Sequence, residues 1–142
     1  MQKTKKKNKF LNNLLSFALL IFSNVSYGSV KIGVWKESIT PRYSELRNSC
    51  LGGYGAPLSN PRCSPVAISD ELTLRTLHIS NKYNKKEQLT VLIFDTTGIG
   101  DSIDKEIRRK IRELTNSIDT DRVIIASTHT HSGLDYQGIW GE

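Results

Sequence analysis

The order of three segments between residues 89 and 127 constrains the fold of this chain more than any other feature. Residues 89–94 form a near-continuous apolar run that ends at Asp95, and residues 122–127 contain a second apolar run. Between them, residues 102–117 carry apolar side chains at helical spacing. Two buried strands joined by an amphipathic helix make a β-α-β unit, in which the strands are parallel and the crossover is right-handed. We therefore predict an α/β fold with a mixed sheet and at least one right-handed β-α-β unit.

The predicted helix has two distinct faces. Asp101 or Ser102 is expected to cap its first turn. Its basic residues cover the outer face, where we expect them to pair with neighbouring acids in solvent. The apolar stripe consists of Ile103, Ile107, Ile111, Leu114 and Ile118.

Two further strands are expected earlier in the chain. Residues 72–79 alternate apolar and polar side chains, which is typical of a half-buried strand. Residues 30–35 alternate enough to predict a first strand, and the Thr-Pro pair at 40–41 ends it. Residues 81–87 are polar and predict a hairpin loop, and residues 42–48 predict a short turn of helix.

Two histidines follow the second strand of the β-α-β unit. His129 and His131 lie in the segment Ser-Thr-His-Thr-His-Ser-Gly, residues 127–133. On an extended backbone, residues i and i+2 face the same side about 6.5 to 7 Å apart. The two imidazoles can then reach one metal ion, or one can bind metal while the other contacts substrate. The alternative is a pair of polar residues that end a strand at the surface.

Asp95 supports the interpretation of the histidine pair as a site. Asp95 and His129 both follow carboxyl ends of strands that we expect to be parallel, which is where open α/β sheets bind their ligands. The Asp95 carboxylate would orient an imidazole or bind metal directly. Alternatively, it caps the loop that follows it.

The positive net charge does not indicate a nucleic-acid partner. The formal charge is +6, but five of the 20 basic residues lie among the first nine positions. From residue 29 onward, 15 basic residues stand against 14 acidic ones. No basic footprint for nucleic acid remains.

The first 28 residues have the pattern of a secretory signal peptide. A lysine-rich start precedes the mostly apolar residues 10–22, and small residues precede the expected cleavage after Gly28. The apolar run is shorter than the roughly 20 residues that span a bilayer. We therefore expect a secreted or periplasmic protein with one domain over residues 29–142; the alternative is an uncleaved membrane anchor.

Export would bring the two cysteines into an oxidising compartment. Cys50 and Cys63 bracket a loop rich in glycine, proline, serine and asparagine, and a disulfide between them would close that loop. Two free thiols are the alternative. Nothing nearby completes a zinc site around this pair. We interpret the glycine cluster at residues 51–55 as a tight loop beside the disulfide.

Four segments of this chain resemble those of one enzyme family. They are residues 33–41 (Gly-Val-Trp-Lys-Glu-Ser-Ile-Thr-Pro), residues 51–55 (Leu-Gly-Gly-Tyr-Gly), residues 68–77, and residues 126–133 with the Thr-His-Thr-His-Ser-Gly signature. The family is the neutral/alkaline non-lysosomal ceramidases, and the resemblance is to their N-terminal catalytic domain. It covers about residues 30 to 138.

The resemblance implies a secreted or surface-bound, zinc-dependent amidase that hydrolyses ceramide to sphingosine and a fatty acid. By this resemblance, His129 binds Zn²⁺ and His131 lies beside the metal, where it assists substrate binding and catalysis. It implies a ceramide-like lipid amide as substrate and leaves open a peripheral contact with a membrane.

Two departures from the family pattern bear on activity. Leu134 stands where the family often has proline, and the family takes a further histidine, a glutamate and a tyrosine from later in a much longer chain. A catalytic zinc needs three protein ligands, and Asp95 or Asp135 is a candidate for the third. We therefore expect an incomplete N-terminal part of a larger catalytic domain. The alternatives are a small exported metal- or ligand-binding module without amidase activity, and a related hydrolase of another amide or ester.

Overall fold

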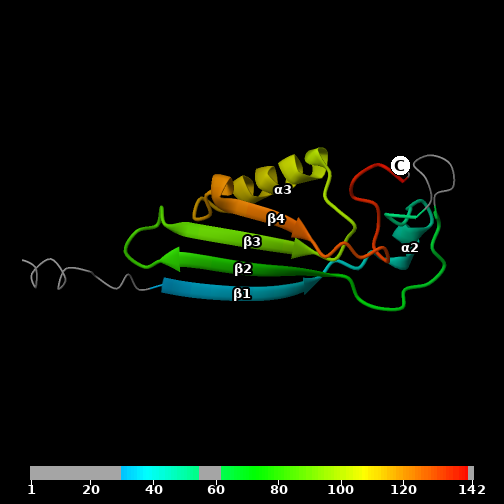
Figure 1. Ribbon diagram of the computed structural model, residues 1–142, viewed down its shortest axis with the longest axis horizontal. Helices are drawn as coiled ribbons and strands as arrows, with labels where there is room; N and C mark the ends of the chain where they lie inside the picture. The colour runs from blue at the N-terminus through cyan, green and yellow to red at the C-terminus, as the bar shows by residue number, and fades with distance from the viewer. Residues whose placement is uncertain (1–29, 55–61, 141–142) are drawn as a thin grey trace, which may run out of the picture.

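A four-stranded mixed sheet organises the computed structural model, which describes residues 30–54 and 62–140 (Figure 1). Neighbouring strands pair antiparallel from the first to the third, whereas the last pair is parallel. The helix α3 (Asp101–Leu114) connects the two parallel strands, so the predicted α/β fold with a β-α-β unit is confirmed. In order across the sheet, the strands are β1 (Val30–Ser38), β2 (Thr73–Asn81), β3 (Gln88–Phe94) and β4 (Val123–Ser127). The predicted signal peptide, residues 1–28, lies outside the described residues.

The helix α3 ends earlier than the sequence pattern predicts. Thr115 has an extended backbone with φ −158° and ψ 144°, although its N–H still donates to the Ile111 carbonyl. The Thr115 side chain accepts a bond from the N–H of Ser117, a local bond that competes with helix. Ile118 therefore lies outside α3, and Leu114 is 83% exposed. The predicted apolar stripe is wrong at this end.

The basic residues of α3 do not all pair with acids in solvent as expected, because Arg108 also donates to the carbonyl oxygens of Thr120 and Val123 and Arg112 donates to the Thr120 hydroxyl. Gly100 occupies the N-cap position without a side-chain bond, so the expected cap by Asp101 or Ser102 is wrong. Asp101 instead pairs with a lysine one turn along the outer face. The ion pairs on the helix are Lys105–Asp101, Arg108–Asp104, Arg109 with Glu106 and with Glu113, and Lys110–Glu113.

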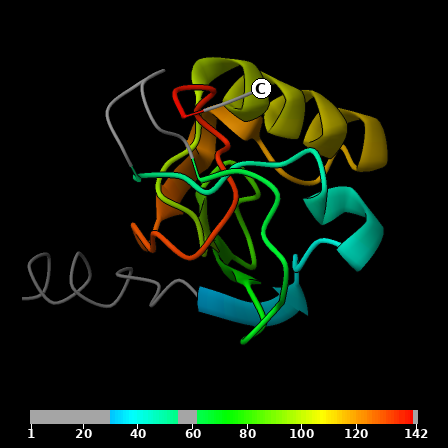
Figure 2. The same cartoon turned by 90° about the vertical axis from the view of Figure 1, so that its right-hand side faces the viewer.

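The sheet has one covered and one open face. Thr90, Leu92 and Val123 are buried on the side along which α3 runs (Figures 1 and 2), whereas Ile124 is 50% exposed. Because paired residues share a face of a sheet, the strand register collects a second set of apolar side chains opposite the helix. We call it the open apolar face: Val30, Ile32, Val34, Leu77, Ile79, Leu89, Val91, Ile93 and Ile124. Within the described residues, no element covers it.

The loops at one end of the sheet gather around the carboxyl ends of β3 and β4 (Figure 1). They include the short helix α2 (Tyr43–Leu46), which buries Leu46, the segment 62–72 and the C-terminal segment 128–140. Figure 2 views the molecule from this end. Throughout residues 30–54 and 62–140, none of the helices has the length and apolar character that crossing a bilayer requires.

Candidate functional site

The two histidines lie where β4 ends, but not on an extended backbone. β4 stops at Ser127, and His129 adopts a left-handed conformation with φ 62°. The expected extended spacing of the two residues is therefore wrong. The turn nonetheless brings the rings together, with 5.1 Å between their centroids and an interplanar angle of 76°.

A backbone carbonyl fixes each imidazole at Nδ1. His129 Nδ1 lies 2.7 Å from the Thr97 carbonyl oxygen, and His131 Nδ1 lies 3.0 Å from the Gly53 carbonyl oxygen. Because a carbonyl oxygen only accepts, each Nδ1 must donate a proton, and in the neutral ring Nε2 then carries a lone pair. This is how metal-binding histidines are commonly oriented. Both rings are therefore prepared to act through Nε2.

The glycine cluster that begins at Leu51, called the glycine loop below, holds the His131 ring. The sequence analysis did not predict this role. Gly53 supplies the carbonyl for His131, and the Tyr54 ring contacts His131 edge-on at 5.6 Å between centroids. The guanidinium of Arg62 lies over the Tyr54 ring, 4.4 Å from its centroid. The signal that could have indicated this was the aromatic Tyr54 among glycines, inside the segment that the two cysteines bracket.

A disulfide closes the glycine segment, and hydrogen bonds tie that segment to the histidine loop. A disulfide joins Cys50 and Cys63. The Gly52 N–H donates to the Gly133 carbonyl at 3.1 Å, and the Asp135 N–H donates to the Cys50 carbonyl at 2.9 Å. The position of the His131 ring is therefore set by a segment that lies 78 residues earlier in the chain.

Asp95 follows β3 but turns toward β2. One carboxylate oxygen accepts from the Thr73 N–H at 2.9 Å, from the Thr73 hydroxyl at 2.7 Å, and from Arg75 at 3.3 Å. Burial raises the pKa of this carboxyl, but the bonds from Thr73 and Thr128 and the charge of Arg75 outweigh burial, so the pKa of Asp95 lies below its usual value. The carboxylate is engaged with Thr73, Arg75 and Thr128, and neither imidazole is among its hydrogen-bond partners.

Asp135 is also engaged with the backbone around it. Its two carboxylate oxygens accept from four consecutive backbone N–H groups, those of residues 137 to 140, at 2.7 to 3.1 Å. This carboxylate therefore shapes the C-terminal turn. In the part of the chain that the structure describes, no three His, Cys, Asp or Glu side chains come close enough together to hold a metal ion. The two histidines fit zinc as nitrogen donors, but as two ligands of a larger set.

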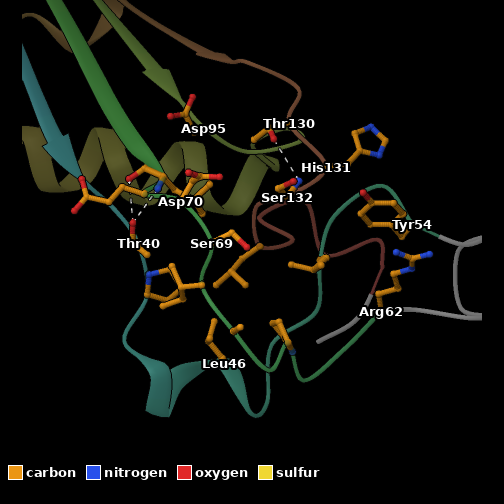
Figure 3. A pocket seen from close by; sticks show the side chains of 18 residues that line it. Thr40, Leu46, Tyr54, Arg62, Ser69, Asp70, Asp95, Thr130, His131 and Ser132 are labelled. Atoms are coloured by element: carbon orange, nitrogen blue, oxygen red, sulfur yellow. Dashed lines mark hydrogen bonds between the residues drawn. The ribbon is translucent and has the colours of Figure 1, made fainter.

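A cavity of about 460 Å³ opens beside His131. Figure 3 shows His131, Tyr54 and Arg62 along one wall, with Thr40, Asp70 and Asp95 on the opposite wall. Leu46 lies at its lower end. Its other apolar lining residues are Pro41, Leu51, Pro65, Ala67, Ile68, Leu72 and Leu134.

Replacing Gly53 with alanine is expected to destabilise the chain by about 1–3 kcal/mol, because the residue has φ +85° and its new Cβ would meet His131 Nδ1 at 2.3 Å. Urea unfolding measures the change. Gly33→Ala is the matched control, since a Cβ there meets nothing within 4 Å. Equal losses in the two variants would contradict the close approach of Gly53 to the ring.

Solved ceramidase structures share this fold. Neutral ceramidase from Pseudomonas aeruginosa matches 76% of this chain with a TM-score of 0.61 and 19% sequence identity. A ceramidase complexed with C2 matches 76% of it with a TM-score of 0.58 and 19% identity. The chain spans 16% of the length of each of these proteins. No protein-family model and no curated protein sequence matches it.

Proposed function

We propose that residues 29–142 are the N-terminal part of a zinc-dependent, ceramidase-like amidase that is exported by a signal peptide at residues 1–28. Its reaction is the hydrolysis of a lipid amide of the N-acylsphingosine class to an amine and a fatty acid. One observation carries this proposal: two adjacent imidazoles, each fixed through Nδ1 on a backbone carbonyl, present Nε2 beyond the end of the parallel strand β4. The ceramidase-like fold supports it.

Each histidine has its own task in this proposal. His129 would hold Zn²⁺ through Nε2, with Thr97 fixing the ring orientation. When bound, zinc lowers the pKa of a water ligand and polarises the amide carbonyl. The His131 ring, whose Nδ1 is fixed on Gly53, can take up a proton at Nε2 and return it to the leaving amine nitrogen. The apolar part of the cavity beside it, which includes Leu46, Leu51 and Leu134, suits the hydrocarbon part of a lipid amide, which would be drawn from a membrane surface or a micelle.

The open apolar face supports a larger catalytic unit. Val30, Ile32 and Val34 are 63%, 67% and 76% exposed on it. A contiguous apolar surface of this kind is expected to be covered by further protein. We therefore propose that the remaining zinc ligands come from outside the described residues, and that the chain is incomplete as an enzyme by itself.

The hydrogen bonds of the two candidate carboxylates favour a second function, that of a binding module. Asp95 and Asp135 are both engaged by their own surroundings, so neither supplies a third ligand in the described arrangement. A small exported metal- or ligand-binding module without amidase activity would need no more than the histidine pair and exogenous ligands.

Binding of a short-chain ceramide, with and without Zn²⁺, discriminates between the two functions. For the amidase-like protein, we expect zinc to strengthen ceramide binding by about 10-fold, because a bound zinc would polarise the amide carbonyl. His131→Ala should remove most of this gain without removing zinc. Calorimetry on the full chain measures the affinity for ceramide. Zinc binding with an unchanged ceramide affinity would overturn the amidase proposal and leave the binding module.

A further inference from the structure

We propose that this chain forms a symmetric dimer in which the β1 strands of two copies pair antiparallel and join the two four-stranded sheets into one. The inference goes beyond the proposed function and does not rest on it. β1 lies at the opposite edge of the sheet from β4 (Figure 1), so this pairing leaves the loop of His129 and His131 uncovered.

β1 is a long edge strand with both faces open. All nine of its residues are exposed, and the exposed fractions of Ile32, Val34 and Trp35 are 67%, 76% and 67%. Its pairing with β2 is continuous, without a bulge, and it contains no proline. No other described segment pairs with its outer edge. The outward N–H and C=O groups of β1 are therefore available to another strand.

The hydrogen bonds between β1 and β2 determine which backbone groups point outward. The Ile39 N–H donates to the Leu72 carbonyl at 2.9 Å, in continuation of the β1–β2 register. Because bonded pairs alternate in an antiparallel ladder, the odd-numbered residues of β1 bond to β2, and the even-numbered residues direct their N–H and C=O groups to the free edge. Two β1 strands can bond through these groups when Val34 lies opposite its own copy, and all nine residues are then paired.

This register places opposite charges across from each other. Lys31 lies opposite Glu37 of the second copy, and the symmetric pair repeats the contact. Within one copy, β2 places Ser80 opposite Lys31 and Leu74 opposite Glu37. Neither charge forms an ion pair among the described residues. Lysine on an edge strand usually hinders pairing, but a directly facing carboxylate stabilises it.

The same register places Trp35 opposite Gly33 of the second copy. A Cβ at Gly33 would meet nothing within 4 Å, so the space beside this glycine is open. An aromatic side chain across from a glycine of a strand can fill such a space. Moving one copy by two residues, which is the next register that keeps the outward groups bonded, would lose these contacts and both charge pairs. The side chains of β1 therefore favour a second copy of the chain as the partner, in one register.

The test measures the mass of the full chain in solution by sedimentation equilibrium at low salt. We expect the wild type to form a dimer. Lys31→Glu and Glu37→Lys should each raise the dimer dissociation constant by about 10-fold or more, because two attractive charge pairs become two repulsive ones. Combining both changes in one chain, or mixing the two single variants in equal amounts, should restore the dimer, since opposite charges then face each other again.

Lys36→Glu is the matched control, because it changes the charge of β1 by the same amount at a position that would lie opposite Ile32 of the second copy. Its dissociation constant should stay close to that of the wild type, and circular dichroism verifies the fold of each variant. A monomeric wild type would overturn the inference and indicate that another partner covers the edge. A dimer that survives either single charge reversal, or that the mixture does not restore, would also overturn it and place the contact elsewhere, as on the open apolar face. An equal loss in Lys36→Glu would contradict the register.

Discussion

Replacing His129 with alanine is expected to lower the zinc affinity of the chain by more than about 100-fold. Removing a partner that only orients a ligand already costs about 10- to 100-fold in metal affinity, so removing a direct ligand should cost more. The Thr97 carbonyl engages Nδ1 of His129 and leaves Nε2 as the free nitrogen of the ring. Nε2 is therefore the atom that we expect to bind the metal. Competition with a chromophoric chelator at fixed pH measures the affinity.

Two controls separate ligand loss from a change of backbone. His129 has φ 62°, a region that asparagine tolerates better than alanine. His129→Asn should therefore lose zinc as fully as His129→Ala while keeping the loop conformation. His78→Gln should retain zinc, because His78 lies within β2 and bonds to Thr90. If His129→Asn and the wild type bind equal zinc, the metal role of His129 is wrong.

Replacing Asp95 with alanine is expected to lower the free energy of unfolding by about 3 kcal/mol. The change leaves the N–H and hydroxyl of the buried Thr73 without their acceptor, and each buried unsatisfied group costs about 1–3 kcal/mol. Urea unfolding at neutral pH measures the loss. Asp70→Ala is the control, since Asp70 is exposed, and its loss should stay within about 0.5 kcal/mol. Similar losses in the two variants would contradict the structural role of Asp95.

The Asp95 carboxylate makes the free energy of unfolding decrease as the pH falls. Because the pKa of Asp95 is lowered in the folded state, its contribution is fully present above the unfolded pKa of about 3.9. The contribution is lost as the pH falls through the lower, folded pKa. Asp95→Asn, which keeps the shape but cannot ionise, should be less stable than the wild type at pH 7. Its deficit should shrink below about pH 4, and a deficit that is constant from pH 7 to pH 2 would contradict the ionised state.

Local patterns were sufficient to predict the main elements. The apolar runs that became β3 and β4, the alternation in β2 and the helical spacing in α3 each predicted the right type of element. The expectation that β3 and β4 are buried strands is wrong, because one face of each strand belongs to the open apolar face. The short helix α2 and the turn between β2 and β3 also follow their sequence signals. The C-terminal end of α3 was not predictable from the helical spacing of apolar residues, because that spacing continues to Ile118. The helix ends at Leu114, where the local bond between Thr115 and Ser117 replaces the helical conformation.

The sequence by itself determined that two histidines and an aspartate follow the ends of adjacent parallel strands, since strand order in a β-α-β unit fixes which ends meet. Only the tertiary structure decided what each of these groups does. His131 is held by Gly53 from 78 residues away, and Asp95 is held by Thr73 from a neighbouring strand. The stacking of Arg62 on Tyr54 also joins two residues that lie between the disulfide-bonded cysteines. Such contacts arise from packing between distant segments, for which the periodicity of a single segment carries no information.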